Sequence, residues 1–240
     1  YAVLHDRLAD FGLDPWFHAL HLRALAEAHE ARAEVGRGLI AGSMGPLGAS
    51  YRPDLPPPVA EAAAAYAEKA ALLAPYVDVI LIETISSLGL AEGALIGAKG
   101  AGRPVWLSVS VDDRDGSKLR SGEPVEGLRA LLAAHPAAAV LANCSVPEAM
   151  EAALEVLSTL GLPFGAYANG FTHISGNFLK NAPTVKELTH RHDLTPEKYA
   201  AFALRWVEMG ATIVGGCCEV GPAHIRHLAE RLRAAGHQIA

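Results

Sequence analysis

Short apolar runs alternate along the chain with longer amphipathic stretches rich in Ala and Leu. The runs are almost continuously apolar, which is typical of strands that are buried on both faces of a parallel sheet. They predict six strands, at Gly38–Ser43, Val77–Glu83, Val105–Val111, Ala138–Asn143, Pro163–Ala168 and Ala211–Gly216. Because strands and helices alternate over the whole chain, we expect an α/β fold with a parallel sheet, either open or closed.

The amphipathic stretches predict six helices. They lie at Pro58–Ala74, Leu88–Lys99, Val125–Ala134, Pro147–Leu160, Thr195–Met209 and Pro222–Ala235. Two helix starts carry capping signals, since Ser145 and Thr195 each precede an early proline and a glutamate. The stretch Gly170–Asp193 has no strong periodicity, and we expect a long loop of the kind that often carries function.

Composition narrows the possible functions. The length of 240 residues suits a single α/β barrel domain over residues 1–240. A net charge of −6 without a long basic run argues against nucleic-acid binding, which needs clustered Lys and Arg. No uninterrupted apolar stretch reaches the length of a membrane span, and the first residues carry no secretory signal. We therefore expect a cytoplasmic protein without a membrane partner.

Polar and reactive residues that could serve in catalysis or binding recur where the predicted strands end. In a parallel α/β fold these ends open onto one face, and active sites form there. A purely structural core does not need polar residues repeatedly at that edge, so the pattern favours an enzyme. The residues concerned are Ser43, Met44, Gly45, Glu83, Ser108, Ser110, Asn143, Cys144, Tyr167, Asn169, Cys217 and Cys218.

The three cysteines all belong to this set. Their odd number and the adjacent pair Cys217-Cys218 fit poorly with a disulfide framework, and in a reducing compartment clustered cysteines favour metal binding or catalysis. Three thiolates suit tetrahedral Zn²⁺ and leave its fourth position open for substrate. Two alternatives remain open: Cys144 acts as a small buried hydrophobe, or the adjacent pair acts as a redox element.

The motifs around these cysteines resemble those of the homocysteine S-methyltransferase family. The resemblance rests most strongly on Gly215-Gly216-Cys217-Cys218, followed by Gly221-Pro222 and His224-Ile225, together with the upstream pair Asn143-Cys144. Weaker matches add to it and extend it from about Gly38 to Leu232. They are Gly42-Ser43 with Gly45-Pro46 and Gly48, Asp78 with Glu83-Thr84, Leu119-Arg120-Ser121-Gly122-Glu123, and Tyr167-Ala168-Asn169.

The resemblance implies a TIM-type (β/α)8 barrel. Family members usually begin with a strand carrying Asp-Gly-Gly-x-Gly-Thr and a second strand ending in Thr-Asn-x-Tyr. Neither motif is present in this sequence, which predicts six strands where the fold has eight. We therefore expect a barrel domain that lacks its first two strands, so that the chain is incomplete at its N-terminus.

The resemblance also implies a function. It assigns Zn²⁺ as cofactor, Cys144, Cys217 and Cys218 as its ligands, and homocysteine as the thiol that accepts a methyl group, giving methionine. It places Glu83 at the homocysteine amine, whereas a helix N-terminal acid is the alternative. Asn143, Tyr167 and Asn169 are further substrate-pocket candidates with structural alternatives. Ser43, Met44 and Gly45 are expected to shape the substrate loop.

The donor and the acceptor leave choices open. Because the chain ends soon after its last predicted helix, we expect a sulfonium donor, S-methylmethionine or S-adenosylmethionine, rather than betaine or a methylfolate. The same fold acting on another small thiol or a selenol is one rival function. A non-catalytic zinc-binding or redox-sensing protein is a second rival, and a barrel-based binding module is a third. The sequence does not determine the oligomeric state.

Overall fold

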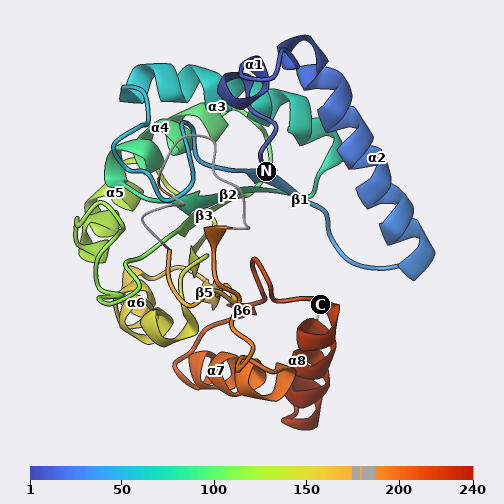
Figure 1. Ribbon diagram of the computed structural model, residues 1–240, viewed down its shortest axis with the longest axis vertical. Coiled ribbons are helices and arrows are strands. Elements are labelled where there is room, and N and C mark those ends of the chain that lie inside the picture. Colours follow the sequence, from blue (N-terminus) through green and yellow to red (C-terminus); the bar gives the residue numbers. More distant parts are fainter. Residues whose placement is uncertain (175–178, 180–186, 240) are drawn as a thin grey trace. The chain divides into compact units, whose positions relative to one another are not determined.

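The computed structural model describes residues 1–174, 179 and 187–239, so the predicted loop Gly170–Asp193 lies partly outside the described residues. The chain divides into two compact units, and each is described by itself. Unit 1 comprises Tyr1–Leu107 and Ala130–Ala138, and unit 2 comprises Ser108–Arg129 and Ala139–Ala240. Figure 1 shows the helices and strands of both units in chain order.

The strands of unit 1 are β1 (Ala41–Met44), β2 (Val79–Ile85) and the first part of β3 (Val105–Val109), in that order. β1 and β2 run parallel, with Ala41 opposite Val79. On the other side of β2, the Ile80 amide donates to the Pro104 carbonyl over 2.9 Å. β2 forms because its branched apolar side chains fill the interior, where most of its residues are buried.

Helices cover these strands. They are α1 (His5–Ala9), α2 (Phe17–Val35), α3 (Val59–Leu73), α4 (Leu88–Ala98) and most of α5 (Leu128–Ala134), with the 3₁₀ turns η1 (Asp14–Trp16) and η2 (Ala74–Tyr76). α3 and α4 pack closely (Figure 1) because small residues line their contact. A Cβ atom on Gly97 would lie 2.5 Å from the Ala63 carbonyl oxygen, so glycine allows the two backbones to approach.

The sequence predicted no element before Gly38, whereas the structure contains the long helix α2 there. Its buried residues Phe17, His21 and Leu25 follow a helical spacing of four. A histidine at the centre of this stripe interrupts the apolar pattern, so the sequence pattern does not predict the helix. The Nδ1 atom of His21 compensates by bonding to the Phe17 carbonyl oxygen over 2.8 Å.

Unit 2 contains the end of β3, then β4 (Ala139–Asn143), β5 (Phe164–Tyr167) and β6 (Ile213–Val214), in that order. β4 runs parallel to β5, and β5 runs parallel to β6. The contact between β5 and β6 needs Gly165, because a Cβ atom there would lie 1.7 Å from the Ile213 carbonyl oxygen. This close approach brings the ends of the three strands together.

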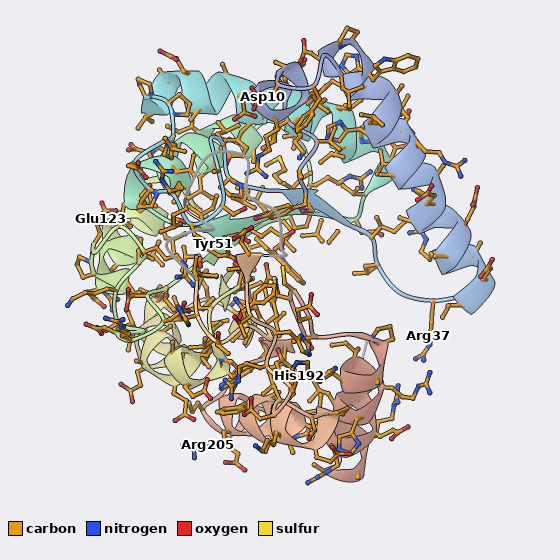
Figure 2. All side chains as sticks on the ribbon, in the orientation of Figure 1. Asp10, Arg37, Tyr51, Glu123, His192 and Arg205 are labelled. Carbon is orange, nitrogen blue, oxygen red and sulfur yellow. The ribbon has the colours of Figure 1, made fainter. Side chains whose placement is uncertain are left out.

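The helices of unit 2 are α6 (Met150–Leu157), α7 (Pro196–Glu208) and α8 (Pro222–Ala234), with the 3₁₀ turns η3 (Val125–Gly127), η4 (Pro147–Ala149) and η5 (Ser158–Leu160). α7 and α8 lie side by side (Figure 1). On the surface, Arg205 of α7 points away from its helix (Figure 2) and bonds to Glu151 of α6 over 2.8 Å.

The predicted α/β class with parallel strands is confirmed, and most element bounds need correction. Gly38–Ile40 lie outside β1, Met44 lies inside it, and Glu83 lies within β2 rather than at its last position. β6 has two residues where six were predicted. Strands end where the ladder to the neighbour ends, which the apolar pattern alone does not reveal. Among the described residues, no helix has the length and apolar character that crossing a membrane requires.

The two predicted caps had different outcomes. Thr195 caps α7 as predicted, since its hydroxyl accepts a hydrogen bond from the Lys198 amide over 3.3 Å. The prediction for Ser145 was wrong, because no side chain caps η4. The Ser145 hydroxyl instead accepts from the Val111 amide over 2.9 Å and donates to the Val111 carbonyl over 2.8 Å. A tertiary partner has replaced the local one.

Candidate metal and substrate site

The three cysteine sulfurs lie together in unit 2. Cys144 directly follows β4, and Cys217 and Cys218 follow β6. The Sγ of Cys144 lies 2.8 Å from that of Cys217 and 3.7 Å from that of Cys218, and the Cys217 and Cys218 sulfurs are 3.9 Å apart. Within the described ranges, these are the residues whose ligand atoms are close enough together to hold a metal ion.

The spacing suits a tetrahedral thiolate site. With Zn–S bonds of about 2.3 Å, the sulfurs of a tetrahedral site are about 3.8 Å apart. Two of the three observed separations match this value, and the third, between Cys144 and Cys217, would lengthen on binding. Cys144 is buried, Cys217 is half-buried and Cys218 is exposed. The cluster therefore has one open side, where a further ligand could approach.

Proton sharing makes the three thiols unequal. The pKa of Cys218 is lowered because the thiols of Cys144 and Cys217 donate hydrogen bonds to its sulfur. The pKa of Cys217 is raised because it donates to its two neighbours and is buried. Cys218 thus releases its proton more readily than Cys217, and a bound metal must displace the remaining thiol protons.

Asn143, the last residue of β4, is fully buried beside the cluster. Its Oδ1 accepts a hydrogen bond from the Ser108 hydroxyl over 2.8 Å, which orients the amide. Its Nδ2 lies 4.0 Å from the Cys217 sulfur. The side chain therefore presents an N–H group to the sulfurs, and buried Ser108 holds it in that orientation.

The backbone of Cys144 is unusual. Its φ angle of 54° lies in the left-handed region, which costs a residue with a Cβ atom about 1–3 kcal/mol. Its amide donates to the Tyr167 carbonyl over 3.2 Å, and its own carbonyl accepts from Ser110 and from Arg120. Such a conformation persists only when its surroundings fix it, and here hydrogen-bond partners hold both the amide and the carbonyl of the residue.

Tyr199 of α7 bonds to the backbone just after β5 and β6 end, a role that sequence reasoning did not predict. Its hydroxyl donates to the Gly215 carbonyl over 2.6 Å and accepts from the Ala168 amide over 3.0 Å. The Ala168 carbonyl in turn accepts from the Cys217 amide over 2.9 Å. Helical spacing could reveal that Tyr199 is buried, but only the structure reveals the target of its hydroxyl.

Tyr167, predicted as a pocket residue, ends β5, and the second predicted pocket residue, Asn169, lies two positions later. Tyr167 contributes its backbone carbonyl to the Cys144 amide, and its side chain is partly exposed. The buried Asn169 accepts a hydrogen bond from the Phe171 amide over 3.2 Å through its side chain, and its own amide donates to the Ser145 carbonyl. These contacts make Asn169 part of the turn that supports Ser145.

Unit 1 holds the other predicted residues. The Ser43 hydroxyl at the end of β1 donates to Oε1 of Glu83 on β2, so these two side chains form one polar group. Thr84, directly after Glu83, has a left-handed φ of 62°. Met44 is fully buried, and the Gly45 carbonyl accepts from the Tyr66 hydroxyl over 3.0 Å. Met44 and Gly45 therefore have packing and backbone contacts here.

Unit 1 also holds a buried charged residue that sequence reasoning did not predict, Lys69 of α3. Its side chain is almost fully buried, and its ammonium donates to the Tyr1 and Val3 carbonyls over 3.2 and 3.4 Å. Burial lowers the pKa of Lys69 to about 8, and Glu83 partly opposes this shift. The residue also lines a cavity of about 610 Å³ with Arg7 and other residues of unit 1.

The amino-acid sequence of this chain is similar to those of known proteins. The sequence profile of the homocysteine S-methyltransferase family matches residues 1–232. Homocysteine S-methyltransferase from Escherichia coli strain K12 is 32% identical over 87% of this chain and 68% of its own length. Selenocysteine Se-methyltransferase from Brassica oleracea var. italica is 28% identical over 65% of this chain, which spans only 43% of that protein.

Solved structures agree with these relatives. The metallated form of the homocysteine methyltransferase MmuM from Escherichia coli superposes with a TM-score of 0.76 and 27% identity, covering 96% of this chain and 77% of that one. The oxidized form of the same enzyme gives a TM-score of 0.75 and 28% identity over the same shares of the two chains. The predicted TIM-barrel class is therefore confirmed.

Proposed function

Because this chain belongs to the homocysteine S-methyltransferase family and is a methyltransferase, we propose that it methylates the thiol of homocysteine to give methionine. One observation carries the proposal: three cysteine sulfurs from two strand ends of unit 2 lie within 4.8 Å of one another. Such a cluster suits a metal that activates a thiol substrate, which a purely structural core does not need.

We propose zinc as the metal, with Cys144, Cys217 and Cys218 as its ligands. Thiolates favour zinc among the common divalent ions, and three protein ligands leave one position free for substrate. The residues fit this role because their separations approach tetrahedral values and the exposed Cys218 leaves one side open. When bound, zinc would lower the pKa of a coordinating substrate thiol and keep it deprotonated at neutral pH.

The remaining residues serve binding and orientation. The Asn143 amide, held by Ser108, would donate an N–H group toward sulfur and stabilise negative charge there. Glu83, held by Ser43, would accept the ammonium group of homocysteine. In unit 2, Tyr167 and Asn169 would act on the substrate through the backbone of the turn after β5. In unit 1, Met44 and Gly45 would shape the substrate loop after β1.

We propose a sulfonium donor, S-methylmethionine or S-adenosylmethionine. In a direct displacement, the substrate sulfur forms a bond to the methyl carbon while the bond from that carbon to the sulfonium sulfur breaks. The electron pair of the broken bond stays on the donor, which leaves as a neutral thioether, and the thiol proton passes to solvent. The positive charge of the donor is cancelled in the step, so no further cofactor is required.

A selenol acceptor is the second candidate, because the chain also resembles a selenocysteine Se-methyltransferase. Selenocysteine carries the same amino and carboxylate groups as a thiol amino acid, so the same Glu83 contact would serve it. The two acceptors differ in the length of the chain that bears the nucleophile. Competition between homocysteine and selenocysteine for one labelled donor would therefore rank the two functions.

The experiment measures zinc content and methyl transfer in protein purified under reducing conditions. Wild type is compared with Cys217→Ala and with the control Ser158→Ala, whose hydroxyl donates to the Glu155 carbonyl near the end of α6. The assay offers homocysteine with S-methylmethionine, S-adenosylmethionine, betaine or a methylfolate. We expect about one zinc per chain in wild type and in the control, none in Cys217→Ala, and turnover with a sulfonium.

Each outcome separates the proposals. Zinc without methyl transfer from any donor would support a zinc-binding or redox-sensing role instead of the enzyme. Wild type that binds no zinc while its thiols are reduced would overturn the metal mechanism. Turnover with betaine or a methylfolate alone would keep the methyltransferase and reject the sulfonium donor.

A further inference from the structure

We propose that Asp113 and Arg120 form a positioning pair that holds Cys144 in its metal-binding conformation. The inference rests on the proposed metal role of Cys144 and assigns a function to two residues of the segment between β3 and η3. The pair acts on the two peptide groups that directly follow the ligand.

Arg120 reaches the Cys144 peptide directly. Its Nη2 donates to the Cys144 carbonyl oxygen over 3.3 Å, and its Nε donates to the Ser110 hydroxyl over 2.8 Å. Ser110 in turn donates to the same Cys144 carbonyl over 3.4 Å. The guanidinium therefore fixes the orientation of this carbonyl both directly and through a neighbouring hydroxyl.

Asp113 completes the clamp one peptide group further along the chain. Its two oxygens accept from the guanidinium of Arg120 over 2.9 and 3.2 Å, which sets the plane of the arginine. Oδ1 also accepts from the Val146 amide over 3.1 Å, two residues beyond Cys144. Oδ2 accepts from the Ile174 amide over 3.3 Å. One carboxylate thus joins the cysteine turn to the segment that follows β5.

The turn needs such a clamp. Cys144 has a left-handed φ of 54°, and a side chain with a Cβ atom disfavours this conformation. If the turn relaxed to an ordinary backbone conformation, the Cys144 sulfur would leave the group formed with Cys217 and Cys218. The Cys144 carbonyl and the Val146 amide belong to the two peptide groups that follow the strained residue, and the ion pair holds both of them.

The burial of the pair supports a specific role. The side chains of Arg120 and Asp113 are 9% and 12% exposed, whereas in the other arginine–carboxylate pairs of the described residues at least one partner is more exposed. Burying two charges costs solvation energy, so such a pair is weak evidence of stability by itself. Its geometry is instead suited to fixing two backbone groups beside a metal ligand.

The test compares three variants with a matched control. Arg120→Met removes the guanidinium, Asp113→Asn preserves shape without charge, and Arg120→Lys keeps charge without the planar fork. The control Arg191→Met removes another mostly buried arginine, whose guanidinium bonds to the carboxylates of Glu148 and Asp193. All variants are made in the whole chain.

Three measurements are made on each protein. Zinc affinity is measured by competition with a chromogenic chelator, and the thiolate charge-transfer absorption is recorded after loading with Co²⁺. The melting temperature and the rate of thiol alkylation by iodoacetamide are measured on the metal-free protein. We expect zinc affinity to fall 10- to 100-fold in Arg120→Met and Asp113→Asn, less in Arg120→Lys, and not in the control.

The pattern of results decides the proposal. Weaker zinc binding with faster alkylation of Cys144, at a melting temperature no lower than that of the control, supports a positioning role. Unchanged zinc affinity in Arg120→Met or Asp113→Asn would overturn it, as would variants that all fail to fold while the control folds, since both results assign the pair to stability alone. Wild type that binds no zinc would refute the proposed metal. The rate of Cys144 alkylation in the metal-free variants would then still test whether the pair holds the Cys144 backbone.

Discussion

Units 1 and 2 each carry half of the proposed chemistry, and they hold their key residues in different ways. In unit 2 the three sulfurs are surrounded by bonds to the backbone, from Ser110, Arg120 and Tyr199. In unit 1 the carboxylate of Glu83 has a side-chain partner, the Ser43 hydroxyl. Backbone control fixes position, whereas a side-chain partner mainly orients a charge.

The strained backbone residues show the same difference. In unit 2 the non-glycine residues with a left-handed φ are the proposed ligand Cys144 itself and Glu219, which directly follows the proposed ligand Cys218. In unit 1 they are Tyr51 and Thr84, and Thr84 is the neighbour of the proposed substrate contact Glu83. A metal site tolerates little error in ligand position, whereas an ammonium group is attracted by a carboxylate over a range of distances. The position of the side chain is therefore more strictly controlled at the proposed metal ligand of unit 2 than at Glu83 of unit 1.

The largest expected effect is the loss of the proposed metal site of unit 2. Replacing Cys144 with serine substitutes a harder, shorter and far less acidic ligand, so zinc should be lost and methyl transfer should fall at least about 10³-fold. Zinc content and single-turnover rate are measured together. Unit 1 should be unaffected, so homocysteine methylation that persists without zinc would contradict the division of roles between the units.

The second effect tests unit 1 alone. Glu83→Gln keeps the shape and removes the charge that would hold an ammonium group, so the KM for homocysteine should rise about 10- to 100-fold. Zinc content should stay at the wild-type value, because no zinc ligand changes. The matched control is Glu27→Gln, at an exposed position of α2. Loss of zinc in Glu83→Gln would show that the two sets of residues are not independent.

The third effect is a pH dependence located in unit 1. Burial lowers the pKa of His21 to about 4, below its ordinary value of 6.5. The unfolded chain therefore binds this proton near pH 6.5 while the native chain does not, so stability falls as the pH drops from 6.5 toward 4. At pH 5 the loss is on the order of 2 kcal/mol.

Urea unfolding at pH 7 and pH 5 measures that loss. In His21→Gln the replacement amide can donate to the Phe17 carbonyl without titrating, so the difference between the two pH values should shrink. The same difference in wild type and variant would show that other groups cause the acid sensitivity. Amide hydrogen exchange would locate the early opening in α2, where His21 lies.

The smallest effect compares two buried tyrosines directly. Tyr199→Phe removes the hydroxyl that bridges Gly215 and Ala168 in unit 2, and Tyr66→Phe removes the bond to the Gly45 carbonyl in unit 1. Each should cost about 1 kcal/mol of unfolding free energy. Only Tyr199→Phe should also weaken zinc binding, by severalfold, when measured by chelator competition. Equal zinc affinity in both variants would argue against a supporting role for Tyr199.

Much of the fold was visible in the sequence because it depends on local pattern. The six apolar runs each overlap one of the observed strands, since a strand buried on both faces must be apolar throughout. The pattern failed at α2, where His21 replaces an apolar residue on the buried face. It also failed at Ser145, whose hydroxyl bonds to Val111 instead of capping the next turn.

The candidate site was visible in part, for a different reason. Cysteine is scarce in this chain, with three residues, and its chemistry is distinctive, so Cys144, Cys217 and Cys218 could be singled out by type and by their place after strands. Ser43 and Glu83 could be placed at strand ends but not paired. Lys69, Asp113 and Tyr199 carry no such signal, because each is a common residue type in an ordinary setting along the chain.

The sequence by itself thus determined the α/β class, the order of the strands and the residue types available for a thiolate site. Those features depend on periodicity and composition, which are properties of neighbouring residues. Only the tertiary structure decided that Arg120 reaches the Cys144 carbonyl, that Tyr199 bridges two strand ends and that Ser43 binds Glu83. Such contacts join residues far apart in the chain, and their partners are selected by distance and geometry after folding.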